Sequence, residues 1–353
     1  MNRLDLPPRP RILVIALRRL GDVLLATPLM RSLRRAWPQA RLEALVFAET
    51  AGILDGNPDV DRVIAIPAQL SAAATLALGA RLFRRYDLAV STQSGDRPAG
   101  LAIGAGRARV APVAANFNGR IKQALLTRSV AVGHGLHRVE QILRLADAVG
   151  VARVAELVCP ATPVPVERPA GGYAVIHAAP MFRYKQWTAA GWRELADRVV
   201  ARGLAVIATG GPAEAERGYL DEVWAGARVI RRDGQLSWPQ LAGLLGEASV
   251  FIGPDTSVTH LAAAAGCPTV AIYGPTDPRL WGPWPVGGLD DMWATSGTVQ
   301  RRGNVWLVQN PLPCMPCQLE GCERRLDSDS QCLNELLPAA VIAATDQALA
   351  SKR

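Results

Sequence analysis

The chain has 353 residues, of which 49% are hydrophobic and 20% are charged, and its formal net charge is +8. This length predicts two domains or one large α/β domain, and the composition excludes a disordered, collagen-like or disulfide-stapled chain. No apolar run reaches the ~18 residues of a membrane-spanning helix. Residues 1–10 are polar and rich in Pro, without the apolar core of a signal peptide. We therefore expect a cytoplasmic protein.

The positive charge comes almost entirely from Arg. Only three of the 39 basic residues are Lys, at Lys122, Lys185 and Lys352, which leaves 36 Arg. The surplus indicates either a well-solvated surface or an anionic partner. Because the Arg-rich patches are dispersed and contain few aromatic residues, we expect no nucleic-acid partner.

The first half alternates short apolar runs with amphipathic segments. Arg11–Leu17 is a continuous apolar run, typical of a buried parallel strand. A helical pattern with Leu24, Leu29 and Leu33 on one side follows it. Further strands are expected at residues 42–46, 63–66, 88–91 and 110–113. Strands that alternate with helical segments predict a doubly wound parallel sheet.

The alternation breaks at residues 158–172, which contain four Pro and resemble a linker. It then restarts, with strands expected at residues 173–177, 205–209, 250–252 and 269–273, and helices at 187–201, 241–245 and 256–265. Two similar α/β halves predict two Rossmann-like domains facing a central cleft. Ligands bind such sheets at the carboxyl ends of the strands, so the loops there are candidate sites.

Asp22 is the first candidate, because it follows the first expected strand through the turn residue Gly21. An acid in the first turn of a helix is favoured by the helix dipole. A carboxylate at a strand's carboxyl end is equally placed to act as a general base. The residues alone leave both interpretations open. The segment has no G-x-G-x-x-G, so the dinucleotide fingerprint is absent.

A second candidate follows the expected strand at 250–252. Asp255, Thr256 and Ser257 supply capping oxygens at the start of a helix, whose free backbone amides favour an anion. His260 lies one turn further, on the same helix face. This arrangement predicts phosphate binding, although a capped helix alone would account for Asp255 or Thr256.

Lys185 is a third candidate. It lies in the loop HAAPMFRYKQW, after the expected strand at 173–177. In a chain whose usual cation is Arg, a Lys in this loop indicates a need for a compact ammonium group. Chance placement is the alternative.

Four of the six cysteines lie within nineteen residues and begin with a C-x-x-C pair: Cys314, Cys317, Cys322 and Cys332. The spacing resembles that of ligands in a tetrahedral metal site, so a structural Zn or Fe ion is one interpretation. Four reduced thiols in a surface loop are the other, because a cytoplasmic protein is not expected to form lasting disulfides.

Two of these segments carry a family resemblance. ILVIALRRLGDVLLATPLMRSLRRAWP and FIGPDTSVTHLAAAAGCPTVAIYGPTDPRLWGPW resemble the glycosyltransferase family 9 heptosyltransferases, and HRVEQILRLADAVG also fits. The RYKQW and LWGPW segments are most similar to the heptosyltransferase III type. The resemblance implies a GT-B fold and inverting transfer of heptose from ADP-heptose to a lipopolysaccharide inner-core acceptor, without a catalytic metal or other cofactor. It also implies work at the cytoplasmic face of the inner membrane, as a peripheral protein.

The resemblance implies roles for individual residues. Asp22 would deprotonate the acceptor hydroxyl, and Lys185 would neutralise the diphosphate. The remaining donor contacts would come from Glu214 or Glu216 at the ribose, Leu236 at the adenine, and Asp255, Thr256, Ser257 and His260 at the helix start. The cysteine cluster resembles that of iron-binding heptosyltransferases that modify autotransporters. A protein acceptor is therefore one alternative, and another nucleotide-sugar enzyme on the same fold is a second.

The implied domains are an acceptor-binding domain at residues 1–160, a linker at 161–172, and a nucleotide-sugar-binding domain at 173–335. The last helix, at residues 336–353, would cross back to the first domain.

Overall fold

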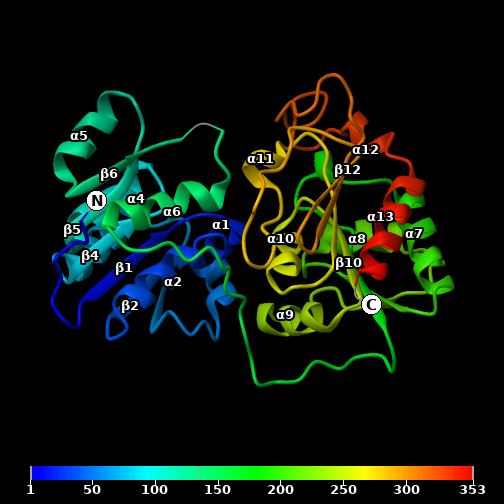
Figure 1. Ribbon diagram of the computed structural model, residues 1–353, viewed down its shortest axis with the longest axis horizontal. Helices are drawn as coiled ribbons and strands as arrows, with labels where there is room; N and C mark the ends of the chain where they lie inside the picture. The colour runs from blue at the N-terminus through cyan, green and yellow to red at the C-terminus, as the bar shows by residue number, and fades with distance from the viewer. Residues whose placement is uncertain (1, 134, 352–353) are drawn as a thin grey trace. The chain divides into compact units, whose positions relative to one another are not determined.

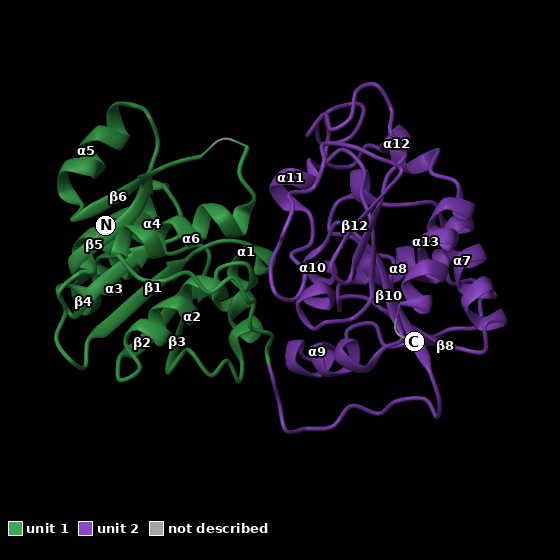
Figure 2. Cartoon of the chain, in the orientation of Figure 1, with its two compact units in different colours: residues 1–160 green, residues 161–353 purple. Residues whose placement is uncertain are grey.

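A computed structural model describes residues 2–133 and 135–351. The chain divides into two compact units, residues 1–160 and residues 161–353, drawn in green and purple in Figure 2. Within the described ranges, every helix falls short of the length and apolar character needed to cross a lipid bilayer.

The first unit is built around a six-stranded parallel sheet in the order β3-β2-β1-β4-β5-β6. Its strands are β1 (Arg11–Ala16), β2 (Arg41–Phe47), β3 (Arg62–Ile66), β4 (Tyr86–Ser91), β5 (Gly106–Val113) and β6 (Arg128–Ala131). This is the doubly wound order of dinucleotide-binding folds, in which the chain reverses direction between β1 and β4. The loops that follow β1 and β4 therefore lie side by side, at the edge where such sheets bind ligands.

Six helices and one 3-10 helix complete the first unit over residues 2–133 and 135–160 (Figure 1). They are α1 (Leu20–Leu24), α2 (Thr27–Ala36), η1 (Ala48–Leu54), α3 (Ala72–Leu82), α4 (Asp96–Ala105), α5 (Phe117–Leu125) and α6 (Arg138–Val149). The helical pattern expected after the first strand is divided into α1 and α2. The reason is Pro28, which lies in the first turn of α2, a position that Pro favours because its missing N–H has no partner there.

The second unit repeats this plan with a seven-stranded sheet in the order β12-β13-β11-β10-β7-β8-β9. The strands are β7 (Tyr173–His177), β8 (Ala205–Thr209), β9 (Ile230–Arg231), β10 (Val250–Pro254), β11 (Thr269–Ile272), β12 (Val299–Arg302) and β13 (Val305–Val308). All pairs are parallel except β12 with β13, which the sequence analysis did not anticipate. The predicted pair of doubly wound α/β sheets is confirmed.

The helices of the second unit are η2 (Arg183–Lys185), α7 (Ala189–Ala201), α8 (Glu214–Val223), α9 (Trp238–Glu247), α10 (Ser257–Ala264), α11 (Pro278–Trp281), α12 (Gln331–Asn334) and α13 (Pro338–Ala350). The expected helices at 187–201, 241–245 and 256–265 correspond to α7, α9 and α10. Trp187 and Trp192 pack edge to face, 5.0 Å between ring centroids, in the core beneath α7.

The segment between α6 and β7 contains no helix or strand over its described residues, all of 150–172. The final helix, α13, packs on α7, β10, β11 and β13 of the second unit. Its buried side chains, including Val341, Ala344 and Ala348, belong to that unit's core. The expected return of the last helix to the first domain stays a prediction.

Candidate active site

Asp22 lies in the first turn of α1, directly after β1, and its side chain is buried. Its Oδ1 atom is 3.3 Å from Nε of Arg138 and 3.7 Å from Nη1 of Arg18. Arg138 begins α6, and its Nη2 donates a hydrogen bond of 3.1 Å to the carbonyl of Thr92, just after β4. Burial lowers the pKa of Arg138 despite the opposing effect of Asp22. The sequence analysis missed both arginine neighbours.

Lys185 and Asp255 form a buried ion pair, with 2.5 Å between Nζ and Oδ2. The same oxygen accepts a hydrogen bond of 2.7 Å from Thr276 Oγ1. Burial alone would raise the pKa of Asp255, but Lys185 and Thr276 outweigh it, so that this pKa lies below its usual value. The three residues meet because β7, β10 and β11 are neighbours and their following loops lie at one edge. Thr276 follows β11 much as Asp255 follows β10, a parallel that the sequence analysis did not use.

The expected helix after β10 is α10, and Thr256 is its N-cap, with its hydroxyl accepting from the amide of Thr259 at 3.4 Å. Ser257 is the first helical residue, and His260 is buried on the first turn, close enough to Asp255 to help lower its pKa. Asp255 was expected to supply a capping oxygen. Its carboxylate instead binds Lys185 and Thr276, because a nearby cation offsets the desolvation cost of a buried carboxylate better than a backbone amide does.

The other predicted donor residues lie around the loops after β8 and β9. Glu216 Oε1 accepts a hydrogen bond of 2.5 Å from the amide of Gly211, and burial raises the pKa of this carboxyl group. Glu214 begins α8 and is exposed. Leu236 is half-buried, one residue before the N-cap of α9. The amide of Gly234 donates to the carbonyl of Gly210 at 2.8 Å, so these two loops are joined.

His177 ends β7 and is buried beside Thr209, with 3.1 Å between Nδ1 and the hydroxyl oxygen. Burial lowers its pKa to about 4, so the ring is neutral at physiological pH. A neutral imidazole at this edge supplies a hydrogen bond and no charge. The cations of the following loop are Arg183, which pairs with Asp329, and Lys185, which pairs with Asp255.

The four clustered cysteines do not form a ligand group. Among the described residues, which include all four, no three His, Cys, Asp or Glu side chains are arranged to hold a metal ion. Cys332 is instead buried in the apolar core of the second unit. Its pKa is raised to about 12, first by burial and then by the three other thiols, Cys314, Cys317 and Cys322, which lie nearby. A metal ion at these thiols stays a prediction from their spacing.

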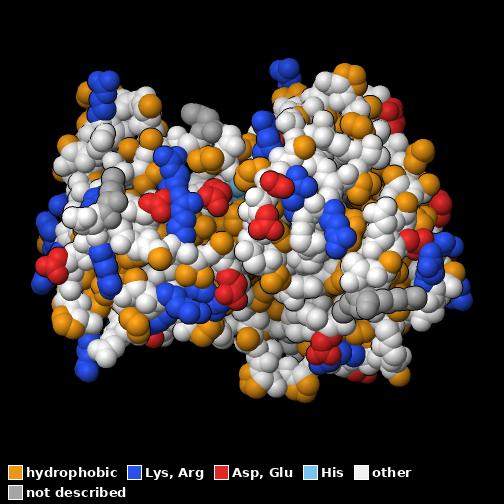
Figure 3. All heavy atoms as spheres, viewed as in Figure 1, with side chains coloured by type: hydrophobic (Ala, Val, Ile, Leu, Met, Phe, Trp, Pro, Cys, Tyr) orange, Lys and Arg blue, Asp and Glu red, His pale blue; other side chains and the backbone are white. Residues whose placement is uncertain are grey.

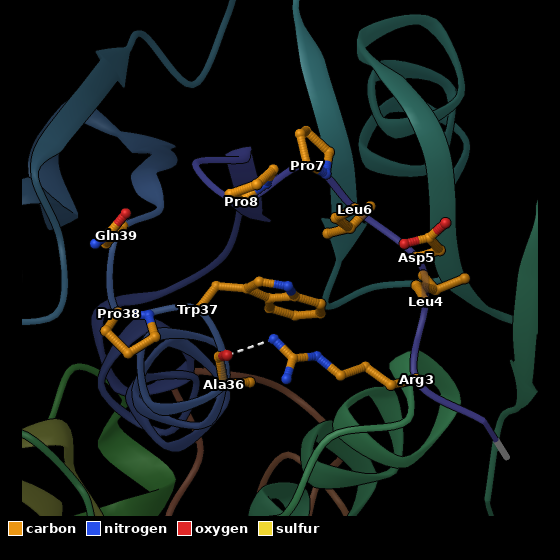
Figure 4. A pocket seen from close by; sticks show the side chains of 10 residues that line it. All are labelled: Arg3, Leu4, Asp5, Leu6, Pro7, Pro8, Ala36, Trp37, Pro38 and Gln39. Atoms are coloured by element: carbon orange, nitrogen blue, oxygen red, sulfur yellow. Dashed lines mark hydrogen bonds between the residues drawn. The ribbon is translucent and has the colours of Figure 1, made fainter.

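A groove of about 580 Å³ lies in the first unit, away from Asp22 (Figure 4). In it the guanidinium carbon of Arg3 lies 4.4 Å from the centre of the Trp37 ring, and Arg3 donates to the carbonyl of Ala36. Trp37 precedes β2 and the N-terminal segment precedes β1, so this groove lies at the amino ends of the strands. Ligands of doubly wound sheets bind at the opposite edge.

A smaller cavity of about 60 Å³ does lie at that opposite edge, beside the ends of β4 and β6. Arg138, which contacts Asp22, is one of its lining residues. The edge that carries Asp22 therefore also carries a small cavity with Arg138 in its wall.

The charged side chains on the face drawn in Figure 3 are scattered, with Asp and Glu side chains lying among the Lys and Arg. A nucleic-acid-binding surface would require a continuous basic stripe. The side chains drawn on this face do not form one.

Comparisons with known proteins agree with this geometry. The family model described as glycosyltransferase family 9 (heptosyltransferase) matches residues 154–287, a span that contains Lys185 and the start of α10. Lipopolysaccharide heptosyltransferase 3 of Escherichia coli is 27% identical over 78% of this chain and 86% of its own length. Lipopolysaccharide heptosyltransferase 1 of Pseudomonas aeruginosa is 29% identical over 88% of this chain and 87% of its own length.

One solved structure is similar over almost its entire length. It is the ADP-heptose lps heptosyltransferase II of E. coli, with a TM-score of 0.73, 20% sequence identity, and coverage of 97% of this chain and 99% of that chain. At this identity the likeness concerns the fold, and it confirms the GT-B class.

Proposed function

The chain belongs to glycosyltransferase family 9, and from this premise we propose that it transfers a heptose from ADP-heptose to a lipopolysaccharide inner-core acceptor. The observation that carries the proposal is the buried pair of Lys185 and Asp255 beside the first turn of α10. A fixed cation next to the free amides of a helix start is suited to a diphosphate.

Within the donor site, Lys185 is the group that contacts the diphosphate. Asp255 is itself an anion, so it acts through Lys185 by holding the ammonium group in place. The amides and hydroxyls of Thr256 and Ser257 complete the phosphate contacts at the helix start, with His260 beside them. This division of roles follows from charge, because two anions cannot be direct partners without a cation between them.

The nucleoside is assigned to the loops after β8 and β9. Glu214 is exposed at the start of α8 and can reach ribose hydroxyls, whereas Glu216 fixes the backbone of the preceding loop through Gly211. Leu236 offers an apolar contact for the adenine ring.

The reaction itself is a single displacement with inversion. Asp22 takes the proton of the acceptor hydroxyl, and the hydroxyl oxygen forms a bond to the anomeric carbon of heptose as the bond to the diphosphate breaks. The departing ADP carries the negative charge, which Lys185 and the start of α10 stabilise. In this mechanism the protein's own cation balances the leaving group, so the catalytic step draws on no cofactor.

We also place the protein at the cytoplasmic face of the inner membrane. Helix α5 exposes a stripe of Phe117, Ile121 and Leu125, with 76%, 47% and 47% of each residue accessible. These positions are four residues apart and therefore share one face. Arg120 is exposed next to them. An apolar stripe beside a cation is typical of a helix that lies on an anionic lipid surface.

The test is mass analysis of products after incubation with ADP-heptose and a heptose-deficient lipopolysaccharide core. We expect the acceptor to gain the mass of one heptose residue, and ADP-glucose or UDP-glucose to support far less transfer. Anomeric analysis of the product should show inversion. No mass gain with this acceptor, but transfer to a protein substrate, would replace the proposed acceptor by the alternative one.

A further inference from the structure

A small cavity of the first unit is bordered by several polar side chains. It has a volume of about 60 Å³ and lies where β4, β5 and β6 end, against one face of α6. Arg138, Gln141 and Arg144 line it from that helix, at spacings of three residues that place them on neighbouring turns. Gln93 lines it from the loop after β4.

The side chain of Gln93 indicates that the cavity binds a polar group. It is only 8% exposed, and both its amide nitrogen and its amide oxygen are buried without a hydrogen-bond partner among the described residues. Leaving such a group unpaired destabilises the folded state, and buried polar groups in folded proteins nearly always have partners. A bound polar group in the cavity would supply them.

The charge of the lining fits an anion. Arg138 and Arg144 are both on the wall, and no Asp or Glu of the described residues lines the cavity. Arg138 already contacts Asp22, but Arg144 forms no ion pair with any described Asp or Glu. Two guanidinium groups and two amides present N–H donors to the same space.

The volume limits what can enter. About 60 Å³ accommodates a few water molecules or one small ionised group, and it is far below the roughly 300 Å³ of sites that enclose whole small molecules. An entire sugar ring would therefore stay outside, with one substituent inserted.

We propose that this cavity binds one oxyanion of the acceptor, either a carboxylate or a phosphate, through Arg144, Arg138, Gln93 and Gln141. The proposal rests on the proposed function, since it assigns the cavity to the substrate whose hydroxyl Asp22 deprotonates. We call it the oxyanion pocket.

The contact with Asp22 explains what the pocket would do. Arg138 lies 3.3 Å from the Asp22 carboxylate through Nε, and its Nη2 donates to the carbonyl of Thr92, another lining residue. One guanidinium group thus connects the pocket to the base. An oxyanion seated there would fix the acceptor relative to Asp22 and so select the hydroxyl that reacts.

The experiment compares the wild type with Arg144→Gln, Gln93→Leu and the control Arg107→Gln. Arg107 is exposed at the amino end of β5, so the control Arg107→Gln removes the same charge outside the pocket. The substrates are ADP-heptose and three forms of the core acceptor: intact, carboxyl-reduced and phosphatase-treated. Acceptor binding without donor is measured in parallel by calorimetry.

We expect Arg144→Gln to raise the acceptor KM and Kd by about ten- to a hundredfold, as for the loss of hydrogen bonds to a charged group. Gln93→Leu should raise both in the same direction. The KM for ADP-heptose should not change in either variant, and Arg107→Gln should match the wild type. Removing the recognised oxyanion from the acceptor should weaken binding to the wild type but not further weaken binding to Arg144→Gln. The carboxyl-reduced and phosphatase-treated forms then identify which oxyanion it is.

If the wild type transfers heptose and the acceptor KM is unchanged in both pocket variants, oxyanion binding in the pocket is wrong and the proposed reaction is unaffected. The proposal would also be overturned if Arg144→Gln and modification of the acceptor each weakened acceptor binding and their effects were additive. Acceptor binding that depends on Arg144, without any transfer, would instead overturn the proposed reaction and support the pocket.

Discussion

Each unit has a buried carboxylate at the carboxyl edge of its sheet, Asp22 after β1 and Asp255 after β10, and the surroundings of the two differ. Asp255 is bound at 2.5 Å by Lys185 and at 2.7 Å by Thr276. Asp22 is approached only at 3.3 Å by Arg138 and at 3.7 Å by Arg18. Both lie between a strand of a doubly wound sheet and the first turn of the next helix, Asp22 within the first turn of α1 and Asp255 just before the N-cap of α10.

The difference in contacts indicates different roles for Asp255 and Asp22. The oxygen of Asp255 is occupied by two short contacts, so this carboxylate is a fixed counter-charge that positions Lys185. The contacts of Asp22 with Arg138 and Arg18 are longer, so its carboxylate oxygens are less fully bound. A carboxylate of the second kind can accept a proton from a substrate, whereas one of the first kind would have to break an ion pair to do so.

The strongest test of this contrast is Asp22→Asn. We expect turnover to fall by about 10²–10⁴-fold, the usual effect of removing a general base, while ADP affinity stays close to that of the wild type. Steady-state kinetics and calorimetry with ADP measure the two effects. Turnover within threefold of the wild type would remove Asp22 from the mechanism.

Lys185→Ala should act on both stability and donor binding. It leaves Asp255 as a lone buried charge, which costs about 3–5 kcal/mol of unfolding free energy. It should weaken ADP-heptose binding by about ten- to a hundredfold, and adenosine binding much less.

The double variant Lys185→Ala with Asp255→Asn separates these effects. The double variant should regain part of the stability that Lys185→Ala loses and none of the donor affinity. The single variant Lys185→Arg should keep part of the donor affinity, because the forked guanidinium carries the same charge but is larger. Equal losses for ADP-heptose and adenosine would indicate a folding defect instead.

Acid should destabilise the second unit before the first. Burial lowers the pKa of His177 from 6.5 to about 4, so the unfolded chain binds more protons than the folded chain between these values. The stability that this neutral ring contributes is complete above about pH 6.5 and is lost as the pH falls toward 4, by roughly 3 kcal/mol. Asp255, whose folded pKa is depressed, adds a further loss below its usual value of 3.8.

Chemical unfolding followed by Trp fluorescence measures this, because eight of the nine Trp belong to residues 161–353. In His177→Gln the loss between pH 6.5 and 4 should largely disappear. A variant that keeps the full dependence would assign it to other groups.

Phe117→Ser should reduce binding to vesicles that contain anionic lipid by about tenfold, because part of the ~1.5–3 kcal/mol from burying a Phe side chain is lost. Phe83→Ser is the matched control, since Phe83 is 64% exposed at the end of α3, outside the α5 stripe. Vesicle sedimentation gives both values. Equal effects of the two changes would refute the assignment to α5.

The smallest effect is expected from the cysteine cluster. If the spacing is a ligand pattern, protein purified without added metal should contain about one Zn or Fe per chain, and its removal should leave Asp22 and Lys185 chemistry unchanged. Elemental analysis and a thiol reagent measure this. Metal well below one per chain, with Cys314 and Cys322 reacting freely, would support four reduced thiols without a metal ion.

The sequence by itself determined the alternation of strands and helices, the restart after residue 172, and the position of Asp22, Lys185 and Asp255 directly after strands. These are local properties, because apolar periodicity and turn residues act over a few positions. It also carried the family motifs. The antiparallel edge strand β12 and the division of the first helical pattern by Pro28 were less apparent, since neither changes the periodicity strongly.

Only the tertiary structure decided which side chains meet. Lys185 and Asp255 are 70 positions apart, and they pair because β7 and β10 are neighbours in the sheet. Arg138 reaches Asp22 because α6 packs on β5, β6 and α2, and its first residue lies beside Thr92, which follows β4. The fate of Cys332, in the core and outside a ligand group, was likewise set by packing. Strand order is a property of the whole sheet, so no local pattern in the sequence could specify these contacts.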